Sequence, residues 1–211
     1  ALTDETGLLQ HAKYHIPHRE HGYCVDDNSR ALLLTVLLET LFGMNHHIKR
    51  LQDIYLSFIY HSYNVNNGWF RNLMSYSRNW IEEIGSEDSH ARVLWSLGVA
   101  TAFTRDENIF LIGIELFRNG LKKVYEIHHP RSLAYAILGM QAYLWRFSGD
   151  LEIKRMRDYA LEKLMDHFKH QNDPAWPWYE DKVSYASVRI PHAMIHAGFT
   201  SHNEAVMQRG L

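Results

Sequence analysis

The chain has 211 residues, 46% of them hydrophobic, which is enough for one sizeable core within a single domain over residues 1–211. Its 22 Lys and Arg nearly balance 24 Asp and Glu without a basic block, which argues against nucleic acid or an anionic membrane surface as a partner. No signal peptide and no apolar run near the roughly 20 residues that span a bilayer is present, and Cys24 stands alone, so a disulfide framework is excluded. These features predict a soluble protein of undecided compartment, with the cytoplasm slightly favoured.

Hydrophobic periodicity divides the first third of the chain into two helices. Residues 27–42 are apolar on nearly every face and end at Gly43, a C-cap candidate, so we expect a helix buried on both sides. Asp27 or Asn28 is the candidate N-cap. Residues 46–63 carry a single apolar stripe, which predicts a helix at the surface.

The same alternation recurs along the rest of the chain. It predicts helices over residues 87–103, 107–127, 131–147, 151–170, 187–199 and 201–211. Pro191 falls near the start of its helix, where the missing N–H would have no intrahelical partner. No β-hairpin is predicted, although residues 179–185 favour a short extended segment. The fold class is therefore all-α.

Buried helices that alternate with amphipathic ones indicate an inner and an outer layer, as in an α/α toroid or a helical solenoid. The loops before the inner helices are long, at residues 13–26, 64–86 and 171–187, whereas those within hairpins, such as 43–45 and 148–150, are short. Long loops that meet at one end favour a toroid with a functional mouth. About three and a half to four hairpins are present where six close the commonest ring, so we expect a partial (α/α)6 barrel, truncated at its C-terminus.

An arginine stands at the start of each of the four inner helices: Arg30, Arg92, Arg131 and Arg189. A cation in a first helical turn opposes the helix dipole at a cost of roughly 0.3 to 1 kcal/mol. We therefore expect each of these arginines to pair with a carboxylate from its own or a neighbouring repeat.

Carboxylates precede two of these arginines, as Asp26 with Asp27 and as Glu87 with Asp88. Alignment on the arginines puts Asp26 level with Asp88, and two carboxylates that face each other across a cavity suit glycoside hydrolysis. A separation of about 5 Å fits a retaining pair and roughly 6.5 to 9.5 Å an inverting pair. The structural alternative is that Ser86 caps its helix and the acids complement the helix dipole. Since that dipole lowers a carboxyl pKa, a general acid here needs burial or a second carboxylate.

The third long loop, residues 173–181, contains Trp176, Pro177, Trp178 and Glu180. Proline beside tryptophan makes a loop rigid and can present an aromatic face to a sugar ring, and we expect Glu180 or Asp181 to hydrogen-bond its hydroxyl groups. The alternative is that the tryptophans hold this loop on the core.

Other chemistries have little support. His15, His18 and His21 suit zinc by residue type, but Pro17 breaks any helix that would align them, and 15 histidines make such spacing common by chance, so no metal site is predicted. The chain has no P-loop and no Gly-x-Gly-x-x-Gly, so no nucleotide cofactor is expected. Cys24 has no evident base partner.

Four segments together resemble a bacterial family of the six-hairpin glycosidase-like superfamily: LTDETGLLQHAKY (2–14), HGYCVDDNSRAL (21–32), GSEDSH (85–90) and WPWYE (176–180). Members are often described as glycosyltransferases or glycosidases, or occur with other carbohydrate enzymes. The resemblance implies a toroid that binds an oligosaccharide or polysaccharide. It implies a pocket built from the following residues: Asp26, Asp27, Glu87, Asp88 and His90, with Trp178 and Glu180 as sugar contacts. His21 and Tyr23, inside a matched segment, and Arg92, beside the acids, complete the candidate substrate-binding set.

The family pattern has an acidic or amide residue before the fourth arginine, where this chain has residues 184–188, SYASV. One contributor to the pocket is therefore expected to be missing. The leading hypothesis is a glycosidase, with one carboxylate from Asp26 or Asp27, the other from Glu87 or Asp88, and His90 and Arg92 positioning them. The superfamily also contains lyases, epimerases and phosphorylases. A non-catalytic sugar-binding or scaffold module and a sugar epimerase that uses histidines such as His90 and His129 remain alternatives.

Overall fold

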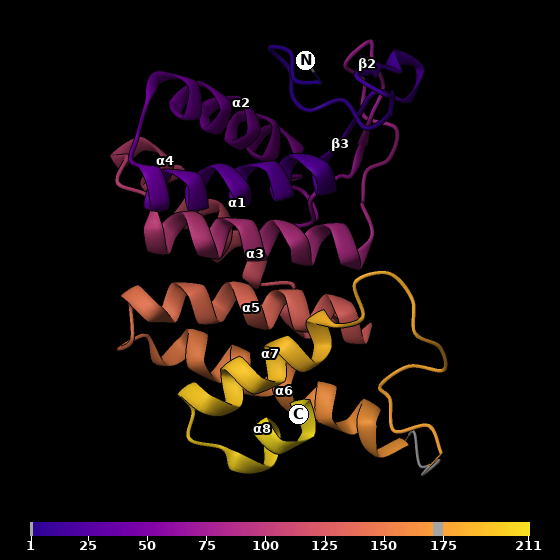
Figure 1. The fold of residues 1–211 in the computed structure, drawn as a ribbon, viewed down its shortest axis with the longest axis vertical. Coiled ribbons are helices and arrows are strands. Elements are labelled where there is room, and N and C mark those ends of the chain that lie inside the picture. Colours follow the sequence, from indigo (N-terminus) through magenta and orange to yellow (C-terminus); the bar gives the residue numbers. More distant parts are fainter. Residues whose placement is uncertain (1, 171–174) are drawn as a thin grey trace.

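The computed structural model describes residues 2–170 and 175–211, which form a mostly helical chain (Figure 1). The α-helices of this part are α1 (Val25–Phe42), α2 (His46–Ser62), α3 (Glu87–Phe103), α4 (Glu107–Leu121), α5 (Pro130–Arg146), α6 (Leu151–His170), α7 (Arg189–Thr200) and α8 (Glu204–Gly210). Two 3₁₀ turns are η1 (Arg19–His21) and η2 (Val124–Glu126). Two-residue strands form two antiparallel pairs, β1 (Ala12–Lys13) with β2 (Ile16–Pro17) and β3 (Tyr23–Cys24) with β4 (Leu73–Met74).

The helices form two layers. In the inner layer α3 packs against α1 and α5, and α5 packs against α7, while α2, α4, α6 and α8 each pack on the inner helix that precedes them. The hairpins follow one another along the long axis of the molecule, from α1 and α2 at one end to α7 and α8 at the other (Figure 1). No described helix combines the length and the apolar character needed to cross a bilayer.

The apolar patterns explain this layering. Most side chains of α3 and α5 are buried, because neighbours cover these helices on several sides. By contrast, α2 buries one stripe, which includes Ile48, Tyr55 and Ile59, at the spacing expected for a helix packed by a single face. The predicted burial of inner helices on several sides is confirmed for α3 and α5. It is wrong for α1, which was expected to be buried on both sides but leaves Leu34, Leu41 and Phe42 exposed, because α2 and α3 cover only part of its surface.

Two glycines allow α3 and α5 to approach closely. A Cβ atom on Gly98 would lie 2.1 Å from the carbonyl oxygen of Gly139, and one on Gly139 would lie 2.5 Å from the carbonyl oxygen of Leu94. The obstructing atoms are backbone, so they cannot move aside as a flexible side chain can. The central pair of inner helices therefore depends on the absence of side chains at these positions.

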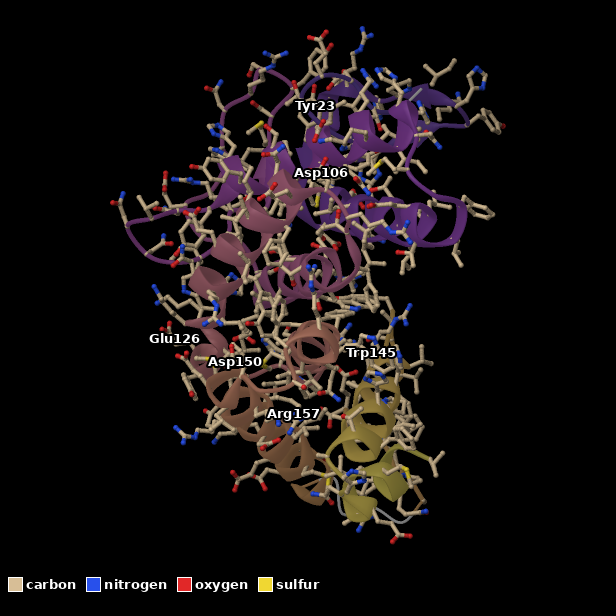
Figure 2. All side chains as sticks on the ribbon, turned by 90° about the vertical axis from the view of Figure 1, so that its left-hand side faces the viewer. Tyr23, Asp106, Glu126, Trp145, Asp150 and Arg157 are labelled. Carbon is tan, nitrogen blue, oxygen red and sulfur yellow. The ribbon has the colours of Figure 1, made fainter. Side chains whose placement is uncertain are left out.

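The outer helices are joined through their first turns. Asp106 accepts a hydrogen bond from the N–H of Ile109 in α4 and pairs with Lys49 of α2 at 3.2 Å. Asp150 likewise caps α6 and lies 2.6 Å from Arg118 of α4 (Figure 2). Each capping carboxylate thus also holds a cation from the preceding outer helix.

Several boundaries agree with the sequence prediction. The bounds of α3 and α6 are those expected, Gly43 is the C-cap of α1 with φ of 81°, and Pro191 lies in the first turn of α7. Ser86 caps α3 through its side chain, as predicted.

Other expectations are wrong. α1 begins at Val25 and has Cys24 as its N-cap without a side-chain hydrogen bond, so neither Asp27 nor Asn28 is the cap. The helix predicted over residues 107–127 ends at Leu121. Residues 179–185 form bends and turns rather than an extended segment, and the two small strand pairs were not foreseen.

The α3–α5 contact predicts the effect of two matched substitutions. Gly139→Ala places a methyl group against the backbone of α3, so we expect a loss of about 1–3 kcal/mol in the free energy of unfolding. Gly149→Ala is the control, because a Cβ atom there meets nothing within 4 Å. Urea denaturation measures both, and equal stabilities of the two variants would contradict the proposed close contact.

Candidate functional site

The first turns of α1, α3 and α5 and the loop before α7 surround one cavity. Its volume is about 570 Å³, and we call it the mouth pocket. It is lined by Asp26, Ser86, Glu87, Asp88, His129, Arg131, Ser132 and Tyr185. The structure thus brings predicted carboxylates from α1 and α3 to one place.

Arg92 lies between two of these carboxylates. Its Nε is 3.0 Å from Oδ2 of Asp88 and 3.1 Å from Oδ1 of Asp26, and 9% of its side chain is exposed. Its single Nε hydrogen is donated to Asp88, so Asp26 contacts the same nitrogen as an ion pair. The Cζ atom lies 4.3 Å from the ring centroid of Tyr135 on α5, close enough for a cation–π interaction.

Arg30 pairs with the acids of its own helix. Its Nη2 is 2.5 Å from Oδ1 of Asp27 and 3.2 Å from Oδ2 of Asp26. Burial raises the pKa of both carboxyls, and the neighbouring Arg30 and Arg92 oppose that rise. With 54% of its side chain exposed, Arg30 is the most solvated partner of this group.

Glu87 holds the start of the next inner helix. Its Oε2 accepts hydrogen bonds from the backbone N–H groups of His128, at 2.8 Å, and His129, at 2.9 Å. His129 is the N-cap residue of α5. The side chain of Glu87 therefore satisfies backbone donors beside the pocket.

Arg131 attaches the loop before α7 to α5. Its Nε donates to Oε1 of Glu180 at 3.0 Å, and its Nη1 donates to the carbonyl oxygen of Tyr185 at 3.3 Å. The Cζ atom also lies 4.2 Å from the ring centroid of Tyr185. Glu180 thus reaches the site as the acid partner of an arginine.

Arg189 is different from the other three arginines. Within residues 2–170 and 175–211 no carboxylate pairs with it; its Cζ lies 4.8 Å from a ring centroid of Trp95, and its Nη1 donates to Nδ1 of His192 at 3.3 Å. This matches the sequence of residues 184–188, which contains no acid. The expected arginine–carboxylate pairs are therefore present in three of the four repeats.

His90 does not lie at the pocket, contrary to the sequence interpretation. It is fully buried, its Nδ1 accepts from the N–H of Phe70 at 3.3 Å, and its Nε2 donates to the carbonyl oxygen of Gly120 at 3.1 Å. Burial lowers its pKa to about 4. Both ring nitrogens are thus used to join loop and helix backbone.

Tyr23 and His21 also lie outside the pocket lining. Tyr23 is buried, donates to Oδ2 of Asp4 at 2.6 Å, and has its pKa raised to about 12, chiefly by burial. His21 is exposed and makes edge contacts with the rings of His11 and His18. Neither side chain is therefore placed to contact a ligand in the mouth pocket.

The tryptophan loop follows its structural alternative at Trp178 but not at Trp176, which is exposed. Trp178 is half-buried and packs on the hydrophobic core and against Tyr179, while Nε1 of Trp176 donates to the carbonyl oxygen of Glu180 at 2.9 Å. Residues 173–174, where this loop was predicted to begin, lie outside the described residues. Neither tryptophan is among the residues that line the mouth pocket.

Sequence reasoning missed Tyr135, Tyr185 and Ser132 as site residues, and it predicted a carboxylate partner for Arg131 without placing Arg131 in the pocket lining. A helical signal for Tyr135 existed, because it follows Arg131 by four residues and so shares its face of α5. Tyr185 gave no such signal, because it lies in a loop whose path only tertiary contacts determine.

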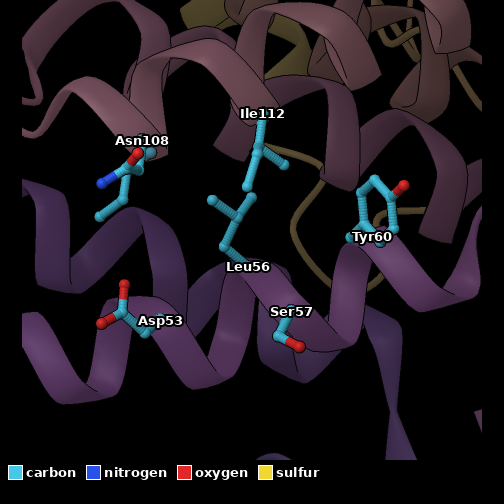
Figure 3. Close-up of a pocket in the computed structure, with 7 residues that line it drawn as sticks. Asp53, Leu56, Ser57, Tyr60, Asn108 and Ile112 are labelled. Carbon is cyan, nitrogen blue, oxygen red and sulfur yellow. The ribbon is translucent and has the colours of Figure 1, made fainter.

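Among the described residues no group of three or more His, Cys, Asp or Glu side chains is arranged to hold a metal ion. Other cavities are present in the described part of the chain, of about 440 Å³ between α6 and α8 and of about 410 Å³ beside α2. A smaller one, of about 180 Å³ between α2 and α4, is lined mainly by apolar side chains such as Leu56 and Ile112 (Figure 3). Asp53 at its edge already pairs with Lys49.

Comparison with known proteins identifies a similarity of fold and none of sequence. No family model matches the sequence, and no curated protein matches it. The fold is similar to that of a solved structure, the crystal structure of a sugar epimerase from a ruminal bacterium, with a TM-score of 0.74 and 12% identity over 99% of this chain. The chain spans 64% of the length of that protein. At this identity the likeness concerns the fold.

The first prediction for the site concerns Arg92. Arg92→Met leaves Asp26 and Asp88 close together without the cation between them, so we expect a loss of roughly 3 kcal/mol at pH 7. Removal of the cation raises the carboxyl pKa values, so the folded variant takes up protons more readily than the unfolded chain, and the loss shrinks as the pH falls towards 4. Arg30→Met, at an exposed position, should cost less than about 1 kcal/mol. Urea denaturation at pH 7 and pH 4.5 tests this, and an equal cost for both variants would refute it.

The second prediction concerns His90. Its folded-state pKa of about 4 lies below that of an unfolded histidine, so the unfolded chain binds a proton first and stability falls as the pH drops from about 6.5 to 4. The full effect is roughly 3 kcal/mol. His90→Phe loses two hydrogen bonds and should be less stable at pH 7, but its stability should depend less on pH between 6.5 and 5. Parallel pH dependences of the two proteins would contradict the buried neutral state.

Proposed function

We propose that this chain is a carbohydrate-active protein that binds a sugar in the mouth pocket. The observation that carries the proposal is the convergence of acidic, basic, hydroxyl and imidazole groups from three helices and a loop around about 570 Å³, a volume typical of small-molecule sites. Tyr185, with 61% of its surface exposed, offers an aromatic ring for the apolar face of a sugar. The likeness of the fold to a sugar epimerase supports the same class of ligand.

The architecture proposed around this pocket is an α/α toroid. The alternation of inner and outer helices, with long loops on the side of the mouth, supports it. In a toroid, further hairpins would continue the inner layer and enclose more of the ligand.

Epimerisation is the reaction that the pocket favours. It requires a group that removes a proton from a carbon beside a carbonyl and a group that returns one to the other face of that carbon. His129 and the carboxylate of Asp88 both line the pocket and are the proposed pair, one taking the proton and the other returning one, while Glu87 fixes the backbone beside His129. Cleavage between Asp26 and Asp88 would require the scissile bond to lie between them, where Arg92 contacts both.

Glycosidic cleavage is the second candidate, because two observations favour it. Asp26 and Asp88 contact the same nitrogen, so they lie close enough for a retaining pair. Burial raises the pKa of Asp26, as a general acid requires. This mechanism requires the substrate to displace the Arg92 side chain from between Asp26 and Asp88. Asp27, which pairs with Arg30, and Glu87, which accepts hydrogen bonds from the backbone of His128 and His129, position neighbouring groups and do not themselves react.

The two reactions differ in products that NMR can separate. The chain is incubated in D₂O with common aldoses and disaccharides, and epimerisation is expected to yield isomers that carry deuterium beside the carbonyl carbon, without new reducing ends. His129→Gln should lower this exchange by about 100-fold or more, the contribution typical of an acid–base group. His47→Gln, on the exposed surface of α2, is the matched control.

Each other outcome has a clear meaning. New reducing ends that disappear in Asp88→Asn would replace epimerisation by cleavage. Sugar binding without turnover would indicate a non-catalytic module, and the absence of any sugar binding would overturn the proposed function.

A further inference from the structure

Three buried oxygen atoms in or beside the mouth pocket have no hydrogen-bond partner within the described part of the chain. They are Oδ1 of Asp26, which contacts Nε of Arg92 only as an ion pair, Oε2 of Glu180 and the phenolic oxygen of Tyr135. Asp26 lines the pocket, whereas Glu180 and Tyr135 stand behind the lining, in contact with Arg131 and Arg92. A buried polar atom without a hydrogen bond is unfavourable, and a ligand that bonds to these oxygens would satisfy them.

The hydroxyl group of Tyr135 lies beneath the mouth pocket. The residue is fully buried, and the charges and dipoles that act on its hydroxyl group belong to Asp26, Asp88, Arg92 and Tyr185. Three of these four line the mouth pocket, so the hydroxyl group lies beneath it. Since burial raises the pKa of Tyr135 to about 12, the group is protonated at neutral pH and can both donate and accept.

The charged side chains around the pocket disfavour the binding of an anion. The three cations beside it, Arg30, Arg92 and Arg131, are each already paired with at least one carboxylate. The acids are more numerous: Asp26, Asp27, Glu87, Asp88 and Glu180. Arg189, which has no described acid partner, contacts Trp95 and is not part of the pocket lining. A negatively charged ligand would therefore meet carboxylates without a free cation.

We propose that the mouth pocket recognises an uncharged, hydroxyl-rich sugar and discriminates against uronic acids and sugar phosphates. This inference rests on the proposed function, because it assumes that a sugar occupies the pocket. Hydroxyl groups of a neutral sugar donate to the carboxylate oxygens of Asp26 and Glu180, which can only accept, and one hydroxyl pairs with Tyr135. A carboxylate or phosphate on the ligand adds repulsion from these acids in a partly desolvated site.

The first test compares sugars of equal stereochemistry by titration calorimetry. Glucose, glucuronate and glucose 6-phosphate form one set, with the corresponding galactose and mannose sets beside it. We expect the neutral member of the set that binds to have an affinity at least ten times that of its acidic partners.

The second test separates recognition from folding. Tyr135→Phe removes a hydroxyl group that has no partner in the protein, so it should leave the unfolding midpoint unchanged or raised while weakening neutral-sugar binding about three- to tenfold. Tyr143→Phe is the matched control, because its hydroxyl group bonds to Arg118 and Asp150 away from the mouth. It should lower stability and leave binding unchanged.

The third test changes charge without changing shape. Glu180→Gln keeps an acceptor oxygen but removes the negative charge that Arg131 neutralises, so binding of the uronate relative to the neutral sugar should rise several-fold. Glu115→Gln, at an exposed position on α4, is the control and should leave the ratio unchanged.

The outcomes distinguish this inference from the proposed function. Tighter binding of a uronate or a sugar phosphate than of the neutral sugar would overturn the inference and leave a sugar-binding protein. Unchanged neutral-sugar binding in Tyr135→Phe would also overturn it. Failure of every sugar to bind would remove both proposals.

Discussion

The mouth of this protein depends on one guanidinium group. Arg92 of α3 contacts Asp88 of its own helix and Asp26 of α1, while its Cζ faces the ring of Tyr135 on α5. Three inner helices therefore meet at a single side chain. Because this group is nearly buried, each partner matters more than in a surface ion pair, where solvent weakens the attraction.

Packing deeper in the inner layer makes that meeting possible. Gly98 and Gly139 let the backbones of α3 and α5 touch, and Trp95 stacks on Tyr135 with ring centroids 5.7 Å apart. A side chain at either glycine would separate the helices and carry Tyr135 away from Arg92. The contact between Tyr135 and Arg92 at the mouth thus depends on the contact between the backbones of α3 and α5, about one to two helical turns further along these helices.

The sequence contained more of the site than residue type alone revealed. Residues four positions apart lie on one helical face, so Asp88 with Arg92 and Asp26 with Arg30 were predictable pairs, and both form. His90 precedes Arg92 by two positions, which turns it about 200° around the helix and towards the core. Alignment of the repeats placed His90 correctly along the axis of α3, but it could not predict on which face of the helix the side chain lies.

Contacts between distant segments were beyond such reasoning. Glu180 reaches Arg131 across 49 residues, and Glu87 reaches the backbone of His129 across 42. Neither periodicity nor capping rules specify these meetings, because loop geometry and helix packing together decide them. For the same reason Tyr23, which stands next to the predicted acids in sequence, lies in the core beside Asp4.

The fourth repeat differs from the other three in the partner of its arginine. Residues 184–188 supply no carboxylate, and Ala186 adopts φ of 54°, a conformation that Asn and Asp tolerate better than other residues with a side chain. Arg189 therefore lies against Trp95 instead of an acid. The acid of the same loop, Glu180, pairs with Arg131 of the preceding repeat. The loop thus strengthens the wall of the mouth pocket at α5, and its own helix begins with a cation that the ring of Trp95, rather than a carboxylate, holds in place.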